Sequence, residues 1–159
     1  MICKTIKYED FNGNEREGKY YFHMSEAEIM DWLTTDGDYT IDKVYGRMVE
    51  KRNGKEIIEA IQDMILRSYG EKSLDGQEFD KSPEIVRHFK QSPAYSALFM
   101  ELATNADKAA DFFNGIIPRK MLEDIHKAVN ENPEDFPEAI RKYYVNDDKK
   151  ASTGIEVLK

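Results

Sequence analysis

The chain has 159 residues, the usual size of one domain, and a formal net charge of −8 at pH 7. This acidity disfavours binding to the phosphate backbone of nucleic acids, which requires Lys and Arg side chains. The single cysteine, Cys3, excludes an intrachain disulfide, and no run of about 18 apolar residues predicts a membrane span. The first residues lack the apolar stretch of a signal peptide, so we expect a cytoplasmic protein.

The N-terminal region predicts a β-hairpin. Residues 2–10 alternate between two faces, which is typical of a strand, and a return strand is expected over residues 15–23. Between them, Asn12 and Gly13 predict a type I′ turn, in which both residues have positive φ. Tyr20 and Tyr21 are consecutive and must point to opposite faces of the strand. We therefore single out Tyr21 as a candidate partner-binding residue.

The rest of the chain predicts short helices. Ser25 and Glu28 form a capping box that starts a helix ending near residue 34. Ser82-Pro83 and Ser92-Pro93 each combine an N-cap with proline at the first helical position, and Asn105 opens a further helix. The remaining expectations are a helix over 40–51, a helix over 55–69 with Gly70 as its C-cap, a loop over 71–81, an end at Asn114-Gly115 for the helix that Asn105 opens, a helix over 119–130 and a short helix around 136–144.

These elements predict a mainly α protein with a small N-terminal β-hairpin, an α+β fold with a compact body of about six or seven short helices. We expect a single domain over residues 1–131, made of the hairpin at 2–23 and the helical body at 25–131. Residues 132–159 are expected to form a C-terminal extension that is partly helical and then frayed.

No pattern in the chain predicts a catalytic or metal site, or a cofactor. The three histidines are far apart, and neither HExxH nor CxxC occurs. The acidic loops at Asp36 and Asp75 fail as EF-hands, because the twelfth position is Arg47 in one and Val86 in the other. Phosphate-binding glycine motifs are also missing. We therefore expect a protein that is not an enzyme.

Two parts of the chain are similar to a family of long-tailed phage proteins, the tail assembly chaperones. The resemblance covers about residues 1–118. In the first part it rests on residues 4–8, 10–13 and the segment YYFHMSEAEIM at 20–30. In the second part it rests on residues 69–73, Asp75-Gly76, Phe79, Lys81-Ser82, Phe89, 94–96, 98–104 and 113–118.

The resemblance implies a helical adaptor made in the host cytoplasm during infection. Such a protein binds the long tape-measure protein, keeps it soluble while tail tube subunits polymerise around it, and is left out of the mature virion. It implies the tape-measure protein as the main partner and the tail tube protein as a further one. Homo-oligomerisation and a longer form made by ribosomal frameshifting stay open.

Binding an amphipathic helix of the tape-measure protein requires an apolar face or groove. Our candidates are aromatic residues, and the alternative is that all of them belong to the core: Phe79, Tyr95, Phe99, Phe112 and Phe113. Two other functions stay open. One is a structural neck or tail-completion subunit that remains in the virion, and the other is a phage-encoded inhibitor of host defence.

Overall fold

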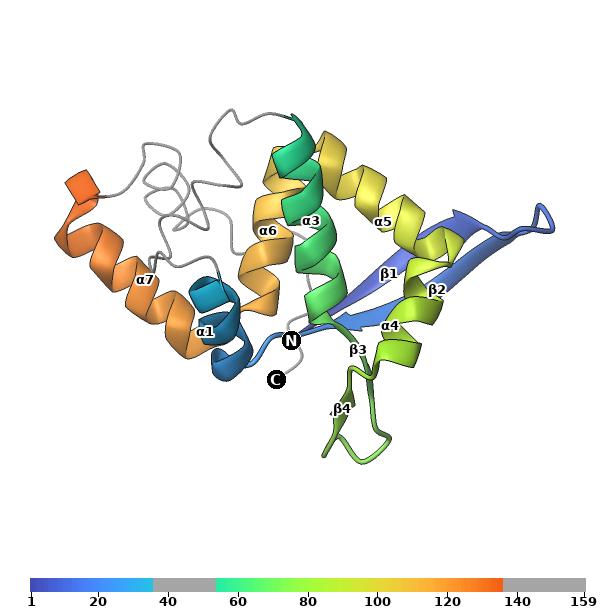
Figure 1. Cartoon of the computed structure of the whole chain (residues 1–159), viewed down its shortest axis with the longest axis horizontal. Helices are drawn as coiled ribbons and strands as arrows, with labels where there is room; N and C mark the ends of the chain where they lie inside the picture. Colours follow the sequence, from blue (N-terminus) through green and yellow to red (C-terminus); the bar gives the residue numbers. More distant parts are fainter. Residues whose placement is uncertain (36–53, 136–159) are drawn as a thin grey trace.

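The computed structural model describes residues 1–35 and 54–135, so the helices expected over 40–51 and around 136–144 lie outside the described residues. Within the described part, six α-helices follow or surround a small antiparallel sheet that starts with the N-terminal hairpin (Figure 1). The prediction of a mainly α protein with an N-terminal β-hairpin is thus confirmed.

The helices and strands succeed one another along the chain without large irregular insertions. The sheet has the order β1-β2-β3-β4. The elements are β1 (Ile2–Glu9), β2 (Glu15–Phe22), α1 (Glu26–Thr35), α3 (Gly54–Ser68), β3 (Tyr69–Lys72), β4 (Phe79–Asp80), α4 (Pro83–Lys90), α5 (Pro93–Thr104), α6 (Ala106–Ile116), α7 (Arg119–Glu131) and a final 3-10 turn (Pro133–Asp135).

Strands β1 and β2 form the predicted hairpin, but the type I′ turn was wrong. Of the residues around the turn, only Gly13 has positive φ, at 81°, and Asn12 does not. The amide of Gly13 donates to the carbonyl of Asp10, and the amide of Asp10 donates to the carbonyl of Asn14. This is a three-residue loop with one left-handed position, which glycine fills at least cost.

The sheet extends beyond the hairpin, which the sequence did not predict. Helix α3 ends at Ser68, and Tyr69 and Gly70 pair with Phe22 and Tyr21 of β2. Gly70 is therefore a strand residue rather than a helix C-cap. A Cβ atom on it would lie 2.6 Å from the ring of Phe79, so the β3–β4 contact requires glycine. The expected loop over 71–81 contains the rest of this second hairpin.

Local capping explains where several helices begin. The backbone amide of Ser25 donates to the Glu28 carboxylate over 2.7 Å, and the amide of Glu28 donates to Ser25 Oγ over 3.2 Å. This reciprocal pair is the predicted capping box. The side chains of Ser92 and Asn105 cap α5 and α6 in the same way. Ser82 occupies the N-cap position of α4, but its side chain makes no capping hydrogen bond.

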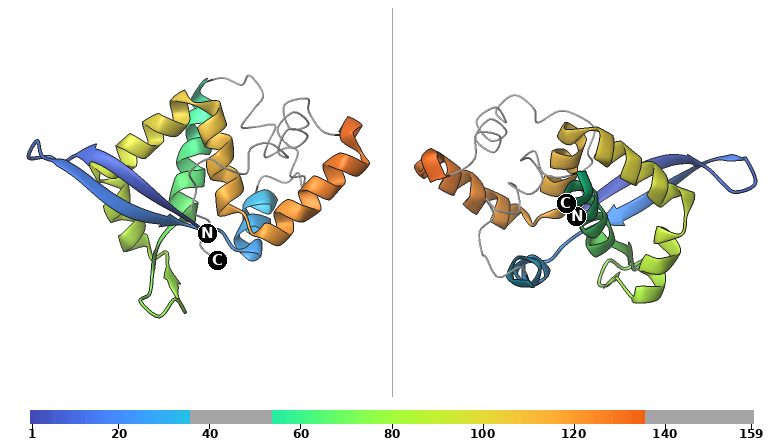
Figure 2. Two further views of the ribbon diagram at one scale, coloured as in Figure 1. Left: turned by 180° about the vertical axis from the view of Figure 1, so that it is seen from behind. Right: turned by 45° about the horizontal axis from the view of Figure 1, so that its top comes forward.

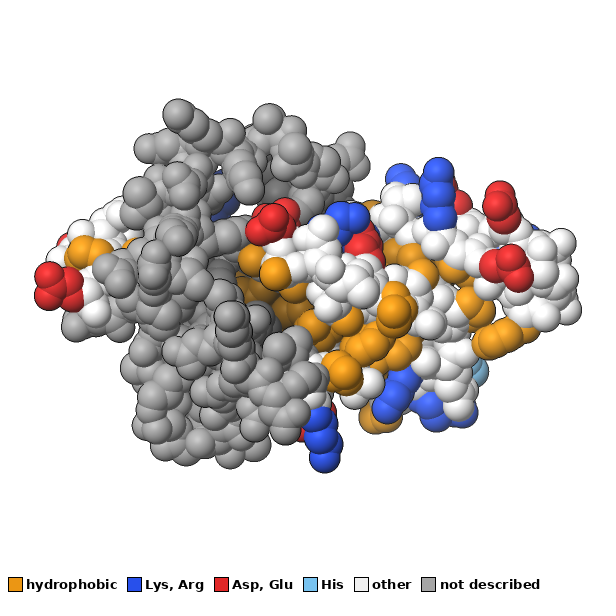
Figure 3. All heavy atoms as spheres, turned by 90° about the horizontal axis from the view of Figure 1, so that it is seen from above, with side chains coloured by type: hydrophobic (Ala, Val, Ile, Leu, Met, Phe, Trp, Pro, Cys, Tyr) orange, Lys and Arg blue, Asp and Glu red, His pale blue; other side chains and the backbone are white. Residues whose placement is uncertain are grey.

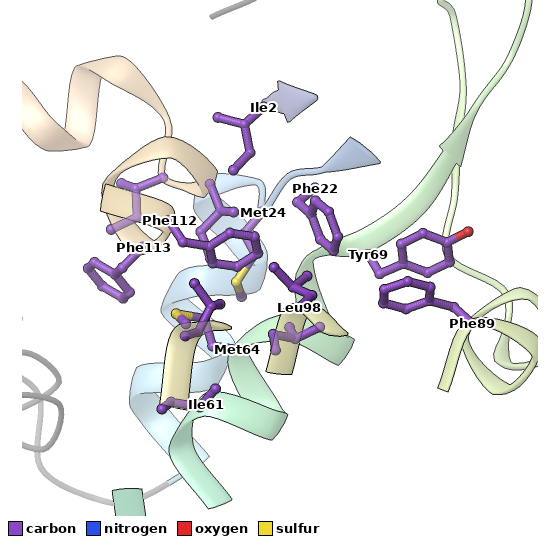
Figure 4. Packing of buried hydrophobic residues seen from close by; sticks show 14 of the residues in the cluster. Ile2, Phe22, Met24, Ile61, Met64, Tyr69, Phe89, Leu98, Phe112 and Phe113 are labelled. Atoms are coloured by element: carbon purple, nitrogen blue, oxygen red, sulfur yellow. The ribbon is translucent and has the colours of Figure 1, made fainter. Parts of the chain in front are cut away.

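The core is centred on aromatic rings from four elements (Figure 4). The ring of Phe22 lies 5.0 Å from that of Phe112 and 5.7 Å from that of Tyr69, and Tyr69 stacks on Phe89 at 4.0 Å. These contacts join β2 to α6, β3 and α4. Such aromatic pairs stabilise a core beyond the effect of their buried area.

The end of β2 fastens two helices to the sheet. The amides of His23 and Met24 donate to the carbonyls of Ser68 and Ile116, at the C-terminal ends of α3 and α6. Gly115, predicted to end α6, lies inside that helix instead. A Cβ atom on Gly115 would stand 2.5 Å from Cγ2 of Ile2, so its absence lets α6 approach β1 closely.

The hairpin of β1 and β2 reaches away from the helical body as an arm. Helix α5 lies along β1, whereas α1 and α7 lie at the opposite end of the molecule from the hairpin tip (Figure 2). The arrangement leaves the outer side of α5 and the tip of the hairpin next to each other at the surface.

Candidate partner-binding surface

Helix α5 carries apolar residues on every side. Nine of its twelve residues are apolar, and the exceptions are Ser96, Glu101 and Thr104. Its inner side is fully used by the core, where Ala94, Leu98 and Leu102 are buried. The apolar residues that remain must therefore face outward or sideways, and Met100 is 54% exposed. A helix that is apolar all round is normally buried all round, so its outer side lacks the cover that its composition predicts.

The only acidic residue of α5 is held within the fold. The Glu101 carboxylate lies 2.9 Å from Nζ of Lys4 in β1 and 2.8 Å from Nζ of Lys108 in α6. Burial alone would raise the pKa of Glu101, but the hydrogen bonds from Lys108 and Lys4 lower it below its ordinary value. The one charge on α5 thus joins the helix to its neighbours and does not cover its apolar outer side.

The hairpin supplies the second part of the surface. Tyr8 is half-buried, and its hydroxyl accepts a hydrogen bond from the Tyr20 hydroxyl over 3.3 Å. Phe11 stands at the tip of the hairpin and is 86% exposed. Exposed side chains of this size are common singly, and they become informative when they adjoin other apolar surface.

The tip that carries Phe11 is fixed by Asp10. The Asp10 carboxylate accepts from the backbone amides of Asn12 and Asn14, each over 2.9 Å, and from Nε of Arg16 over 2.9 Å. The amide of Asn14 and the guanidinium of Arg16 lower the pKa of Asp10 to about 2. The turn is therefore held in one conformation at neutral pH.

A groove of about 540 Å³ separates these two parts. One wall is formed by Tyr8, Glu9 and Phe11 of the hairpin, and the other by α5 and the turn that precedes it. On the helical side the groove is lined by Lys90, Gln91, Ser92, Pro93, Tyr95, Ser96, Ala97 and Met100. Figure 3, a view from above, shows hydrophobic side chains gathered over the middle of this face and reaching toward the hairpin, with charged side chains around them. We call this feature the hairpin–α5 groove.

Two of the predicted partner-binding residues belong to α5. Tyr95 lines the groove and also packs edge-on against Phe89 at 5.8 Å. Its hydroxyl is buried without a hydrogen-bond partner, and burial raises its pKa. Phe99 stacks beside Tyr95 with ring centroids 6.2 Å apart and is half-buried. Both residues therefore contact the core and the surface at once.

Two further candidates lie near the second hairpin and outside the groove. Phe79 of β4 is half-buried, with its ring 6.1 Å from that of His23 and 5.7 Å from Nζ of Lys81. The Tyr21 ring lies 5.2 Å from Nζ of Lys72, on the strand face opposite to Tyr20. These contacts are within the chain and place both aromatic rings away from α5.

Phe112 and Phe113 lie in the core, with exposures of 2% and 3%. The structure thus places them where the alternative for the aromatic candidates had them. The sequence did not single out Phe11 and Met100, which together expose most of the apolar surface beside the groove. The available signals were the apolar residues on every side of α5 and the large side chain next to the Asn-Gly turn.

Other kinds of site are not formed by the residues described. Within residues 1–35 and 54–135 no group of three His, Cys, Asp or Glu side chains is arranged to hold a metal ion. None of the helices in these ranges is long and apolar enough to cross a membrane.

A family model described as phage tail assembly chaperone matches residues 1–156 of the chain. The chain belongs to this family. The match runs beyond residue 118, where the resemblance drawn from the sequence ended, and so includes the C-terminal region. Neither the curated proteins nor the solved structures contain a significant match. Membership of the tail assembly chaperone family supports a chaperone role in phage tail assembly, and it implies a function without catalysis.

Proposed function

We propose that this chain is a non-catalytic chaperone that binds the phage tape-measure protein and keeps it soluble while the tail tube assembles. The observation that carries this proposal is the exposed apolar surface of α5 and the hairpin in a member of the tail assembly chaperone family. A tape-measure protein is long and helical, and before assembly its apolar stripes are exposed. A protein that covers such stripes reversibly prevents their aggregation.

The proposal extends to place and partners. The protein acts in the host cytoplasm, releases the tape-measure protein when tail tube subunits assemble, and is absent from the mature virion. Its net charge of −8 supports this role, because an acidic carrier limits its own self-association and attracts basic segments of a client. Mass spectrometry of purified virions tests the last point, and a stoichiometric amount of this chain in the particles would favour a structural subunit instead.

Co-expression tests the main proposal. The tape-measure protein of the same phage is produced with and without this chain, and the soluble fraction is separated by size-exclusion chromatography. We expect the tape-measure protein to be soluble only in the presence of this chain and to co-elute with it. An insoluble tape-measure protein, with this chain eluting alone, would refute the proposal.

A further inference from the structure

We propose that the hairpin–α5 groove is the client site and that it holds one amphipathic helix of the tape-measure protein, with a basic residue of that helix beside Glu9. This inference rests on the proposed function and adds the site and the chemistry of its occupant. The site differs from the full set of aromatic residues expected from the sequence, because it includes Phe11 and Met100 and leaves out Phe112 and Phe113.

The shape and lining of the groove fit a helix. Its two walls come from a strand pair and a helix, and both present apolar side chains toward the space between them, namely Tyr8, Phe11, Pro93, Ala97 and Met100. A volume of about 540 Å³ holds a few large side chains rather than a folded domain. An amphipathic helix offers such a set at positions i, i+3 or i+4, and i+7 along one side.

The charges on the groove specify the occupant further. Glu9 lines the hairpin wall and Lys90 the helical wall, both are exposed, and neither forms an ion pair with another residue in the described ranges. Glu101 and Asp10, by contrast, are held by basic side chains. An unpaired carboxylate beside an apolar groove favours a client helix that has Lys or Arg next to its apolar stripe. A second copy of this acidic chain is less favoured because of charge repulsion.

The groove is formed before the client arrives. The hairpin wall is fixed at its tip by the Asp10 hydrogen bonds, and Tyr8 is joined to Tyr20. The helical wall is fixed by three buried residues of α5, Ala94, Leu98 and Leu102. A binding site that needs no ordering of its own loses less entropy on binding, so its walls act as a ready-made receptor for the client helix.

The first test uses matched apolar substitutions in the full-length chain. Met100→Gln removes exposed apolar surface from the groove, and Leu74→Gln removes it from the tip of the β3–β4 hairpin, which is fully exposed and outside the groove. We expect Met100→Gln to weaken binding of the co-expressed tape-measure protein by about tenfold and Leu74→Gln to leave it within about twofold. Equal thermal unfolding of both variants and the wild type controls for folding.

The second test concerns charge. Glu9→Lys is compared with Glu123→Lys, which makes the same change on α7 at the far end of the molecule. Glu9 faces Glu15 across the hairpin, so its replacement by Lys removes a like-charge pair and leaves the hairpin folded. We expect only Glu9→Lys to weaken binding, and we expect a Lys→Glu or Arg→Glu change in the client segment to restore it.

Photo-crosslinking identifies that segment. A benzophenone side chain replaces Ser96, which lines the groove, and in a control it replaces Leu74. We expect crosslinks from position 96 to a tape-measure segment with apolar residues at helical spacing and an adjacent basic residue. If the wild type solubilises the tape-measure protein but both groove variants do so equally well, the inference is wrong and the proposed function stands. A dimer of this chain that Met100→Gln dissociates would overturn the inference in favour of a second copy. A wild type that fails to solubilise the tape-measure protein refutes both.

Discussion

Helices α5 and α6 are neighbours in the chain and pack against each other, yet they use their apolar residues differently. Helix α6 has one apolar side, and its large residues on that side, Phe112, Phe113 and Ile116, are all buried. Helix α5 has apolar residues on all sides and buries only Ala94, Leu98 and Leu102. The comparison teaches that α6 has the apolar residues that folding requires, whereas α5 has more. The surplus lies beside the hairpin–α5 groove and is explained by binding.

The largest effect is expected on the inner side of α6. Phe112→Ala removes a ring that packs on Phe22, and it leaves a cavity in the centre of the core. We expect the free energy of unfolding to fall by about 3–5 kcal/mol, measured by urea denaturation. A loss below about 1 kcal/mol would mean that α6 does not serve folding in the way the comparison requires.

A smaller effect is expected where α6 meets β1. In Gly115→Ala the new methyl group meets the buried side chain of Ile2. Overpacking of this kind costs about 1–3 kcal/mol, and the better helix propensity of alanine returns about 1 kcal/mol. We therefore expect a net loss of about 1 kcal/mol. In an Ile2→Ala background the same change should be neutral or stabilising, and an unchanged penalty there would contradict the close contact.

The ion pairs that join α5 to α6 and β1 give a third prediction. Because the folded-state pKa of Glu101 is lowered, its contribution to stability is complete above the unfolded-state pKa and is lost as the pH falls through the folded-state value. Glu101→Gln should therefore reduce the free energy of unfolding by about 1 kcal/mol or less at pH 7, since the pair is partly exposed. The difference from the wild type should shrink toward pH 3. A difference that grows on acidification would reverse the assigned sign.

The smallest effect on folding is expected on the outer side of α5. Met100→Gln exchanges an exposed apolar side chain for a polar one of similar length, so we expect the free energy of unfolding to change by less than about 0.5 kcal/mol. Thermal unfolding followed by circular dichroism measures this change. A loss as large as that of Phe112→Ala would show that the outer side of α5 is needed for folding, and it would remove the contrast between the helices.

Much of the fold could be predicted because its signals are local. The capping box at Ser25, the caps at Ser92 and Asn105 and the alternation of β1 depend on residues within four positions of one another. The strands β3 and β4 were missed because their pairing depends on Tyr21, about fifty positions away from Gly70. The turn type was wrong because the Asp10 side chain, rather than the Asn-Gly pair alone, determines the loop.

The candidate site was predicted only in part, for a similar reason. Helical spacing shows that Tyr95, Phe99, Phe112 and Phe113 lie on particular sides of their helices, but not which side the rest of the chain covers. Tyr95 proved to lie on the groove and the two phenylalanines of α6 in the core. Phe11 gave no periodic signal, because it stands in a turn, and its role depends on a groove formed between segments about eighty residues apart.

Hydrogen–deuterium exchange of the chain, alone and in complex with the tape-measure protein, tests most directly the claim that the hairpin–α5 groove serves binding. If the claim is right, the complex will show added protection over residues 8–11 and 93–100, with little change over residues 69–80 of the second hairpin. Protection confined to the second hairpin or to α7, with residues 8–11 and 93–100 exchanging as in the free chain, would contradict it.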